Sequence, residues 1–507
     1  MSLIEQHFRN TEKLIKSIDA NKIASWLLEE GYFPEQYILP PSFKVTNFSL
    51  QKDPYIKDLA NPPRRKLTNI SYPKTLLTYR VFGIQHPWNY HDLVFWLIND
   101  WEQVIKHLFH RELKIFSYSF PIPVNAKKKG ELSLLRAGRM IYEWIEMAEN
   151  DLVAEANQYT YIIRSDISKF YNSIYTHSIA WALHGRDTAF NDKENKLLGN
   201  KIDRVVQYAN DARTNGIPVG SAISDLIAEI VLASIDRQVS KCLIDIDFIA
   251  TRFKDDYRIL CNSQEDAKKI LKVLARELDN FNLVINENKT KILELPEGLY
   301  RQHDREYFDS SLRNKNEIDF KTFELTFLKV LDIHRKHPGT SILEKFLSEL
   351  FDYDHNFKVL FSGTKSTREK QILKTFSLLM LLKRESEKVL CYVLSIIEAI
   401  YEIYKGEFKL KDHIKSLIES ETRKASKKGS VFELVWLVFF ARYLKVGIES
   451  FKELIDESLL DNLFLKSIIS SQQKIYNDSK IDLFVKPKDC IGVSLAMRLA
   501  VFKRDKN

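Results

Sequence analysis

Cysteine is scarce in this chain of 507 residues, and its four cysteines are widely separated. Disulfide frameworks and structural zinc sites are marked by closely paired cysteines, and none of these four has such a spacing. We therefore exclude both kinds of scaffold as the basis of the fold and expect a reducing compartment. The four residues are Cys242, Cys261, Cys391 and Cys490.

The chain also lacks an apolar run long enough to cross a membrane. Its most apolar helical segment, Val431–Leu444, is interrupted by Glu433 and Arg442. That segment is shorter than the ~20 residues that a spanning helix needs. The first residues carry Glu5 and Arg9 and show no signal-peptide core. These absences predict a cytoplasmic protein with no membrane segment.

The charges are unevenly balanced, with 76 Lys and Arg against 68 Asp and Glu, which gives a net charge of +8. An excess of this size favours a polyanionic partner. It is explained equally well by lysine-rich helices that keep a large protein in solution. The length predicts two or three domains, because it exceeds what one ordinary core accommodates.

Two adjacent acids stand between two segments that read as β-strands. Phe248–Phe253 and Tyr257–Cys261 are rich in aromatic and β-branched residues, and Asp255 and Asp256 fall at the tight turn between them. Adjacent carboxylates repel each other, so a pair of this kind holds a divalent cation or caps nearby backbone. Such pairs are common on solvated turns, and the pair alone indicates little.

Two earlier segments give the acidic pair its context. Tyr161–Tyr171 is an apolar strand pattern with one acid, Asp166, at its end. Between this strand and the acidic hairpin, the loop Gly216–Ser221 opens directly into a segment of helical periodicity. The order is a strand with an acid, a glycine loop with a helix, and a hairpin with two acids.

This order and these residues resemble motifs A, B and C of the reverse transcriptase palm. The segments 173–185 and 216–230 are similar to those of the bacterial "unknown group" and abortive-infection (Abi) reverse transcriptases. The chain length and helical tail are most similar to the phage-exclusion polymerases of P2-type prophages. The motif resemblance covers roughly residues 70–300.

The resemblance implies an α+β fold of reverse-transcriptase fingers and palm, a right-hand polymerase, followed by an all-α HEAT-like domain. The expected domains are 1–150 for the N-terminal helix and fingers, 151–300 for the palm with motifs A to D, and 301–507 for a helical domain in place of a usual thumb. The sequence beyond Thr322 fits this, because it shows long helical periods and no convincing strands.

The resemblance also implies which residues carry the chemistry. Asp166, Asp255 and Asp256 are the expected catalytic acids, and with the backbone carbonyl of Ile167 they are expected to hold two Mg²⁺ or Mn²⁺ ions. Two such ions stabilise the attacking and leaving oxygens when a hydroxyl displaces pyrophosphate from a deoxynucleoside triphosphate. The residues expected to bind the nucleotide are Tyr171, Ile167, Gly220, Arg80 and Lys289.

Three of these have a specific expected role. Tyr171 stands where reverse transcriptases carry an aromatic residue that excludes the 2′-hydroxyl of a ribonucleotide. Lys289 resembles a lysine that donates a proton to the leaving pyrophosphate. Arg80, with Lys74 behind it, is expected to grip the triphosphate in the fingers. The structural alternatives are a core tyrosine, a solvated strand lysine and a surface arginine.

Three positions depart from the family pattern. Motif C begins with Phe253 where most relatives have tyrosine, and Lys254 stands at a position that is usually small or apolar. Val219 replaces a glutamine that helps to hold the nucleotide and the template, and a valine side chain cannot form a hydrogen bond. Use of a template is therefore in doubt, whereas the catalytic acids are intact.

The resemblance implies a bacterial DNA polymerase that acts in anti-phage abortive infection. It further implies untemplated synthesis of single-stranded DNA attached covalently to a tyrosine of the protein, and a homotrimer or homohexamer. Tyr32, Tyr37 and Tyr55, in an irregular amino-terminal stretch, are the candidates for that tyrosine by expected mobility. Two alternatives stay open, namely a templated RNA-directed DNA polymerase of retron or intron type and a non-catalytic palm-fold phage sensor.

Two helices are expected before the palm. Leu14–Glu30 shows apolar residues at helical spacing and ends at Gly31. Arg136–Asp151 shows a second apolar stripe and leads into the motif A strand.

Overall fold

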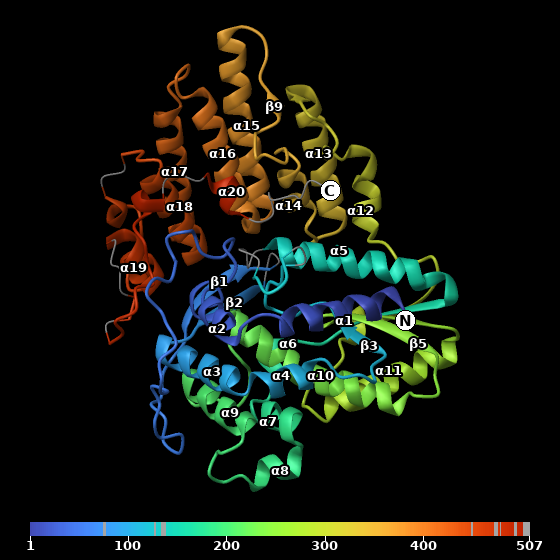
Figure 1. Ribbon diagram of the computed structural model, residues 1–507. Helices are drawn as coiled ribbons and strands as arrows, with labels where there is room; N and C mark the ends of the chain where they lie inside the picture. Colours follow the sequence, from blue (N-terminus) through green and yellow to red (C-terminus); the bar gives the residue numbers. More distant parts are fainter. Residues whose placement is uncertain are drawn as a thin grey trace.

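The computed structural model describes the chain except for residues 75–77, 126–127, 133–137, 448–449, 471–474, 477, 491–493 and 500–507, and except for the side chains of 138–145. Figure 1 shows two stacked regions, a sheet with its surrounding helices and a second region built of helices standing side by side. The predicted α+β architecture, with fingers, palm and a helical domain, is confirmed.

The palm sheet has five strands in the order β3-β5-β6-β4-β7. β5 and β6 form the predicted hairpin, and β4 pairs antiparallel with both β6 and β7. β3 runs parallel to β5 at the edge. The strands are β3 (Ile115–Ser117), β4 (Tyr161–Asp166), β5 (Phe248–Phe253), β6 (Asp256–Cys261) and β7 (Lys291–Glu294).

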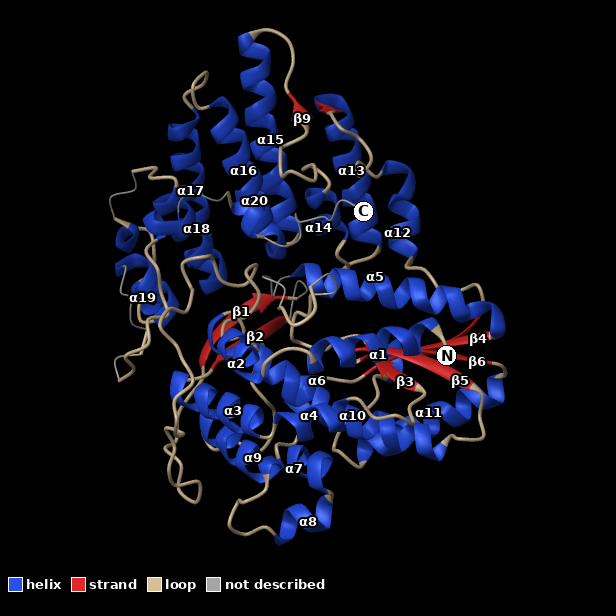
Figure 2. Cartoon of the chain, viewed as in Figure 1, coloured by secondary structure: helices blue, strands red, loops and turns tan. Residues whose placement is uncertain are grey.

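Helices cover both faces of this sheet (Figure 2). α10 (Ala222–Cys242) and α11 (Gln264–Asp279) pack against one face, and α1 (Leu3–Lys16) and α5 (Gly138–Glu155) lie on the other. Successive side chains of a strand point to opposite faces. The face under α1 and α5 therefore receives every second residue of β4, ending with Asp166.

The fingers are a two-stranded antiparallel hairpin of β1 (Thr68–Pro73) and β2 (Tyr79–Ile84). The amide of Gly83 in β2 donates to the carbonyl of Val219 at 3.1 Å, which joins the fingers to the loop before α10. The helices around the fingers and palm are α2 (Ala20–Glu29), α3 (Pro87–Asn99), α4 (Trp101–Leu108), α6 (Phe170–Ser173), α7 (His177–His184), α8 (Arg186–Asn191) and α9 (Leu198–Ala209).

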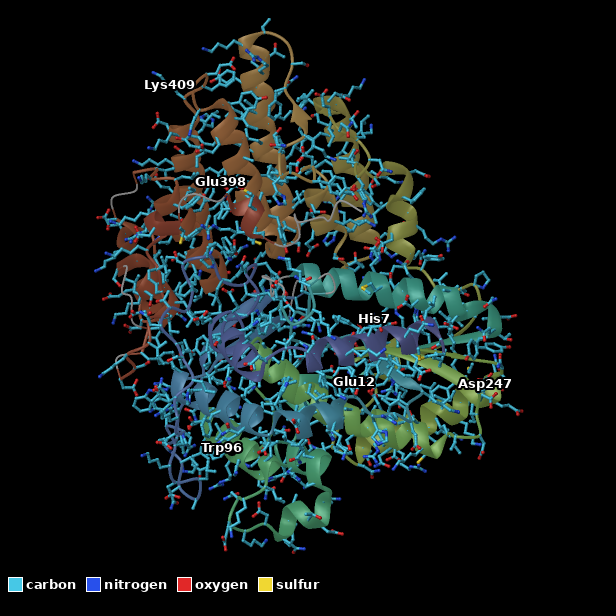
Figure 3. All side chains as sticks on the ribbon, in the orientation of Figure 1. His7, Glu12, Trp96, Asp247, Glu398 and Lys409 are labelled. Atoms are coloured by element: carbon cyan, nitrogen blue, oxygen red, sulfur yellow. The ribbon has the colours of Figure 1, made fainter. Side chains whose placement is uncertain are left out.

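The second region is helical from α12 onward. Glu398, labelled in Figure 3, accepts hydrogen bonds from the Tyr443 hydroxyl at 2.6 Å and the Leu495 amide at 2.7 Å, which ties three of its helices together. The helices are α12 (Gln302–Tyr307), α13 (Phe320–Lys336), α14 (Ile342–Ser348), α15 (Lys365–Glu385), α16 (Leu390–Tyr404), α17 (Leu410–Lys428), α18 (Val431–Tyr443), α19 (Leu463–Ser470) and α20 (Leu495–Arg498).

Short elements complete the chain. The expectation of no strand beyond Thr322 is wrong in one detail, because β9 (Val359–Leu360) pairs in parallel with β8 (Ile318–Asp319). The 3₁₀ turns are η1 (Ala156–Gln158), η2 (Glu287–Lys289), η3 (Phe308–Ser310), η4 (Glu387–Val389), η5 (Phe451–Glu453), η6 (Glu457–Leu459) and η7 (Pro487–Cys490).

The predicted helix Leu14–Glu30 is wrong, because α1 ends at Lys16 and α2 begins at Ala20. Ser17 turns back onto α1, and its hydroxyl donates to the Leu14 carbonyl at 2.6 Å. Asp19 then caps α2 by accepting a hydrogen bond from the Asn21 amide. Polar side chains that bond to local backbone end the first helix and start the second.

The carboxy-terminal segment returns to the fingers. Phe43 packs between Phe464 and Phe484, with ring centroids 5.4 Å and 5.3 Å away. Asp478 accepts hydrogen bonds from Arg65 at 2.8 Å and pairs with His86 at 2.9 Å. The apolar core therefore continues without a break from the fingers into the helical region.

Among the helices of the described residues, none combines the length and apolar character that a membrane span requires.

Candidate active site

Three acids meet where β4 ends and the β5–β6 hairpin turns. Asp166 is the last residue of β4 and stands directly opposite Asp256, the first residue of β6. Asp255 lies in the turn just before it, and its carbonyl accepts a hydrogen bond from the Ile167 amide at 3.2 Å. The structure thus brings these four residues together, as the sequence analysis expected, and their catalytic role stays a prediction.

The three carboxylates are crowded. Asp166 is buried, Asp255 is half-buried and Asp256 is exposed. Loss of solvent around the carboxyl, followed by repulsion from Asp255 and Asp166, raises the pKa of Asp256 to about 7. Burial and the charge of Asp166 raise the pKa of Asp255 as well. Asp256 keeps much of its surface exposed to solvent, so we attribute the raised pKa mainly to repulsion from the other two carboxylates.

Lys289 neutralises some of this charge. Its ammonium group contacts Asp166 Oδ2 at 2.9 Å, and the amide nitrogen of the Asn286 side chain approaches Asp166 Oδ1 at 3.3 Å. Burial lowers the pKa of Lys289, but the hydrogen bond to Asp166 and the neighbouring carboxylates outweigh this and raise it. The predicted proton donor is therefore at the acids and protonated, and Asn286 is a contact that the sequence analysis missed.

Tyr171 reaches the same region from the start of α6. The residue is half-buried, and its hydroxyl donates to Asp225 Oδ1 at 2.6 Å. Burial and the charge of Asp225 raise the pKa of Tyr171 well above its usual value. Lys254, at the hairpin tip, contacts the other oxygen of Asp225 at 3.3 Å. Asp225 therefore anchors both side chains, although no sequence motif marked it as part of the site.

Gly220 has a structural reason to be glycine. Its φ is +123°, and a Cβ there would lie 2.7 Å from the ring of Phe82 in the fingers. The space beside it is filled by protein, because Phe82 and Pro34 close onto the loop. Its predicted contact with a nucleotide stays a prediction.

One cation of the fingers acts on the acids, and a cation of the helical region lies near it. Arg80 is exposed, and its charge acts on Asp255, where it favours the ionised form. Burial lowers the pKa of Lys388, and the charges of Arg80 and Lys74 lower it further against the opposing effect of Glu344. Lys388 follows about 300 residues after the fingers in a helical segment, so local sequence patterns gave no sign of it.

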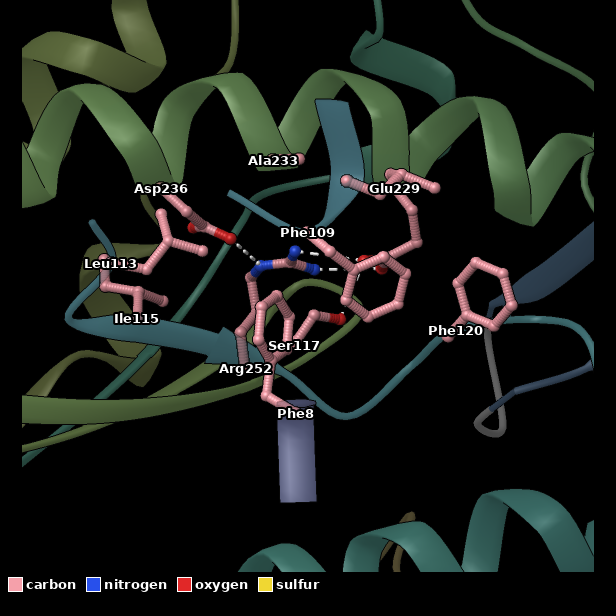
Figure 4. A pocket seen from close by; sticks show the side chains of 11 residues that line it. Phe8, Phe109, Leu113, Ile115, Ser117, Phe120, Glu229, Ala233, Asp236 and Arg252 are labelled. Atoms are coloured by element: carbon pink, nitrogen blue, oxygen red, sulfur yellow. Dashed lines mark hydrogen bonds and ion pairs between the residues drawn. The ribbon is translucent and has the colours of Figure 1, made fainter. Parts of the chain in front are cut away.

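A buried ionic cluster holds the hairpin from behind (Figure 4). Arg252 of β5 makes two hydrogen bonds to Glu229, at 2.9 Å and 3.0 Å, and one to Asp236 at 2.8 Å. Its Nη1 also donates to the carbonyl of Lys254 at 3.1 Å. Ser119 donates to Glu229 and accepts from the Lys254 amide. The tip that carries Asp255 is therefore fixed by side chains of α10 and of the segment after β3.

The electrostatics of this cluster follow from its burial. Burial alone would raise the pKa of Glu229, but the charge and hydrogen bonds of Arg252 lower it overall. Burial raises the pKa of Asp236 to about 6, against the opposing effect of Arg252. A cavity of about 20 Å³ lies beside these groups, enough for one water molecule. A charged residue inside a strand reads as solvent-exposed in a sequence, which is why Arg252 was missed.

The acids fit divalent cations that arrive with a nucleotide. Hard carboxylate oxygens are what Mg²⁺ prefers, and Mg²⁺ is usually held by one or two carboxylates together with substrate phosphates. Within the described ranges, no three Asp, Glu, His or Cys side chains already converge as a closed metal cage. Lys289 instead occupies one oxygen of Asp166.

The expected mobility of the three candidate tyrosines is not observed for Tyr32. This residue is buried, and its hydroxyl donates to the Gln85 carbonyl at 2.6 Å, so the expectation is wrong for it. The ring of Tyr37 packs against Tyr72 at 5.5 Å. Tyr55 stacks on a tryptophan but keeps 39% of its surface exposed.

Comparison with known proteins identifies the central segment of the chain. Residues 116–328 match the family model described as reverse transcriptase (RNA-dependent DNA polymerase). This segment includes the palm sheet with its three acids, apart from the first residue of β3. The chain therefore carries a domain of the reverse-transcriptase type, a nucleotidyltransferase class. No match was found among curated proteins.

Solved structures of telomerase are distantly similar. Telomerase from Candida albicans in complex with a fragment of telomeric RNA is 13% identical, with 84% of this chain and 64% of that chain covered and a TM-score of 0.34. Apo telomerase from Candida tropicalis, truncated of its C-terminal domain, is 17% identical, with 49% and 52% covered and a TM-score of 0.31. The chain spans about half to two thirds of the length of these proteins, and residue roles do not transfer at such identities.

Proposed function

Because residues 116–328 match the reverse transcriptase family, we propose that this protein is a DNA polymerase that adds deoxynucleotides to a hydroxyl group by two-metal nucleotidyl transfer. The observation that carries the proposal is the pairing of Asp166 with Asp256 across adjacent strands, with Asp255 beside them. Crowded carboxylates with raised pKa values gain from a divalent cation, because it relieves their mutual repulsion.

Asp166, Asp255 and the Ile167 carbonyl would hold two Mg²⁺ or Mn²⁺ ions, with Asp256 in support. Bound ions supply positive charge at the attacking and leaving oxygens, where negative charge grows during transfer. Lys289 Nζ contacts Asp166 at 2.9 Å, and in this proposal it gives its proton to the leaving pyrophosphate. Arg80, Lys74 and Lys388 would neutralise the triphosphate from the fingers side.

The substrate of this reaction is a deoxynucleotide in our proposal. The Tyr171 ring is held in place by the hydrogen bond of its hydroxyl to Asp225. A ring fixed in this way leaves no room for adjustment around a sugar that carries a 2′-hydroxyl. Gly220 lets Phe82 of the fingers pack closely onto the loop before α10, because a Cβ there would clash with the ring.

We further propose that synthesis is untemplated, starts on a protein hydroxyl and serves abortive infection against phages in the bacterial cytoplasm. The apolar, partly buried Val219 supports the first point, since it cannot hydrogen-bond a templating base. A tyrosine hydroxyl can replace a primer end if it reaches the metals in line with the α-phosphorus. The proposal includes a homotrimer or homohexamer, as the resemblance implies.

The decisive experiment uses purified protein freed of nucleic acid. It is incubated with a labelled dNTP and Mg²⁺ or Mn²⁺, and the products are run on a denaturing gel with and without nuclease. Label that migrates with the protein until nuclease removes it supports protein-primed synthesis. Label that appears only after a primer and template are added, and runs free of protein, favours a templated RNA-directed polymerase instead.

Matched variants separate catalysis from sensing. Asp255→Asn should lose incorporation, whereas Asp332→Asn, which changes an exposed acid on α13, should retain it. In cells challenged with phage, protection that Asp255→Asn abolishes supports a catalytic defence role. Protection that survives in Asp255→Asn, together with no incorporation by the wild-type protein, favours the non-catalytic sensor.

A further inference from the structure

Two arginines stand directly behind the acids on the same face of the palm sheet. Arg164 and Arg258 are opposite each other in the β4–β6 ladder, two residues along from the Asp166–Asp256 pair. Residues two apart in a strand share a face, and at 3.2–3.4 Å per residue they are separated by roughly 7 Å. A pair of acids is thus followed by a pair of guanidinium groups.

These guanidinium groups lie close to one another and share few hydrogen-bond acceptors. Glu149 of α5 accepts hydrogen bonds from both Arg258, at 2.7 Å, and Arg301, at 3.0 Å. Arg164 makes one long contact, 3.5 Å, to the carbonyl of Tyr300. Burial and then the charge of Arg258 lower the pKa of Arg164 to about 10. One carboxylate therefore accepts hydrogen bonds from two arginines, while Arg164 lies near Glu149 and Asp256 and, within the described residues, forms an ion pair with neither.

Two donor atoms of this cluster are left without a partner. Arg164 Nε and Arg258 Nη1 are buried, and neither has a hydrogen-bond acceptor among the residues that the structure describes. Buried donors without acceptors are costly, and native proteins pair nearly all of them. The cluster therefore has hydrogen-bonding capacity that the described residues leave unused.

Arg164 of this cluster lines a cleft of about 730 Å³ between the palm and the helical region. Lys291 lines its palm side as well, and Arg305 of α12 lines the other. Two acids, Glu297 and Glu306, also line the cleft, and Glu306 is paired with Lys336 and His337. Tyr300, with 58% of its surface exposed, also faces this cleft. Cations along a groove with an accessible aromatic ring are typical of single-stranded nucleic acid sites, because the cations follow phosphates while the ring stacks on a base.

We propose that this arginine cleft binds the phosphates of the newly made single strand directly behind its growing end. The inference rests on the proposed function, since it names where the product goes. The spacing supports a strand, because the arginines lie about one nucleotide from the acids at which each new phosphodiester forms. In the proposed function a free triphosphate is bound by Arg80 and Lys74 of the fingers, and of these the charge of Arg80 acts on Asp255.

Because α5 covers part of this face of the palm sheet, the remaining surface favours a single nucleic-acid strand over a duplex. α5 lies on this face beside β5, and its Glu149 meets Arg258 from that side. The accessible part of this face lies over β4 and β7, whose residues line the cleft. A single strand fits along this half of the sheet without displacing α5.

The test is binding of a fluorescent oligothymidylate to the full-length protein, without dNTP or divalent ions, by anisotropy at several salt concentrations. Arg164→Gln keeps a polar side chain and removes one charge that has no carboxylate partner. We expect its affinity to fall about tenfold and the slope of log K against log salt to shrink by about 0.7, the value for one phosphate of a single strand. The control is Lys272→Gln, an exposed cation of α11 on the opposite face, which should bind like the wild type.

Further arms make each result decisive. Arg164→Lys should recover most of the salt slope, and Arg164→Gln should melt no lower than the wild type, because it relieves crowding among cations. Products made by Arg164→Gln should be shorter. Unchanged oligonucleotide affinity and slope in Arg164→Gln would overturn the proposal, as would a loss of dNTP binding with oligonucleotide binding intact. Because this binding needs no catalysis, it can hold even if the wild type incorporates no nucleotide, which would count against the proposed function alone.

Discussion

The hydroxyl of Tyr171 donates a 2.6 Å hydrogen bond to Asp225, the acid whose other oxygen contacts Lys254 at 3.3 Å. Lys254 sits at the hairpin tip in a left-handed conformation, with φ of +52°. A residue that departs from the family pattern is therefore linked, through one carboxylate, to the ring that we expect to face the sugar. The ring expected to select the sugar and the hairpin tip beside Asp255 therefore share one support.

This link predicts a graded loss of sugar discrimination. Tyr171→Ala should admit ribonucleotides, since it removes the ring altogether. Tyr171→Phe should keep most of the preference for dNTP, and Asp225→Asn should weaken it by less than Tyr171→Ala does. The measurement is the ratio of dNTP to NTP incorporation for each variant. An unchanged ratio in Tyr171→Ala would return this tyrosine to a purely structural role.

The acids should differ in importance. Asp166→Asn and Asp255→Asn should each lower incorporation by roughly a thousandfold or more, because each removes several kcal/mol of charge stabilisation through the metals. Asp256→Asn should cost less. Circular dichroism and melting curves check that the variants fold. Near wild-type incorporation by Asp255→Asn would show that the assignment of the site is mistaken.

The crowding of the acids predicts a dependence of stability on pH. The pKa of Asp256 is raised to about 7, from 3.8 for a free side chain, so the folded protein binds more protons than the unfolded chain between these values. Its contribution to stability is therefore lost as pH rises from about 4 to about 7. Asp256→Asn should raise the melting temperature relative to the wild type at pH 8 and change it little at pH 4.

A magnesium titration extends the same argument. Mg²⁺ should raise the wild-type melting temperature more at pH 8 than at pH 5, because the ion competes with protons for the carboxylates. Asp166→Asn should abolish this gain. Equal stabilisation at both pH values would contradict the raised pKa at this site.

The buried arginine behind the hairpin should matter for stability. Arg252→Met leaves Glu229 and Asp236 buried without their cation, which should lower the free energy of unfolding by about 3–5 kcal/mol. Arg276→Met, which removes an exposed arginine beside Glu277, is the control and should have little effect. Urea denaturation measures both. Equal stability of the two variants would mean that the cluster does not secure the hairpin.

The elements nearest the acids could be predicted from the sequence because their signals are local. The strand ending at Asp166 and the hairpin around Asp255 follow from apolar runs that surround a polar turn. The helix expected over residues 14–30 failed because Ser17 and Asp19 bond to local backbone, a choice that apolar spacing does not register.

The features of the site that depend on register could not be predicted. Arg164 and Arg258 are far apart in the sequence, and only the pairing of β4 with β6 sets them side by side. The alternation of side chains along a strand gives one clue from the sequence. Each arginine stands two residues from an acid, so the arginine and the acid share a face of the sheet. Lys388 had no such clue, since it reaches the fingers from the helical region.

The return of the carboxy-terminal segment to the fingers joins the fingers and the helical region into a single mechanical body. A hinge motion of the β1–β2 hairpin by itself would have to break the contacts of Asp478 with Arg65 and His86. The packing of Phe43 between two aromatic rings adds a second attachment of the carboxy-terminal segment to the amino-terminal part of the chain. A movement of the hairpin that leaves these contacts intact must therefore carry the carboxy-terminal segment with it.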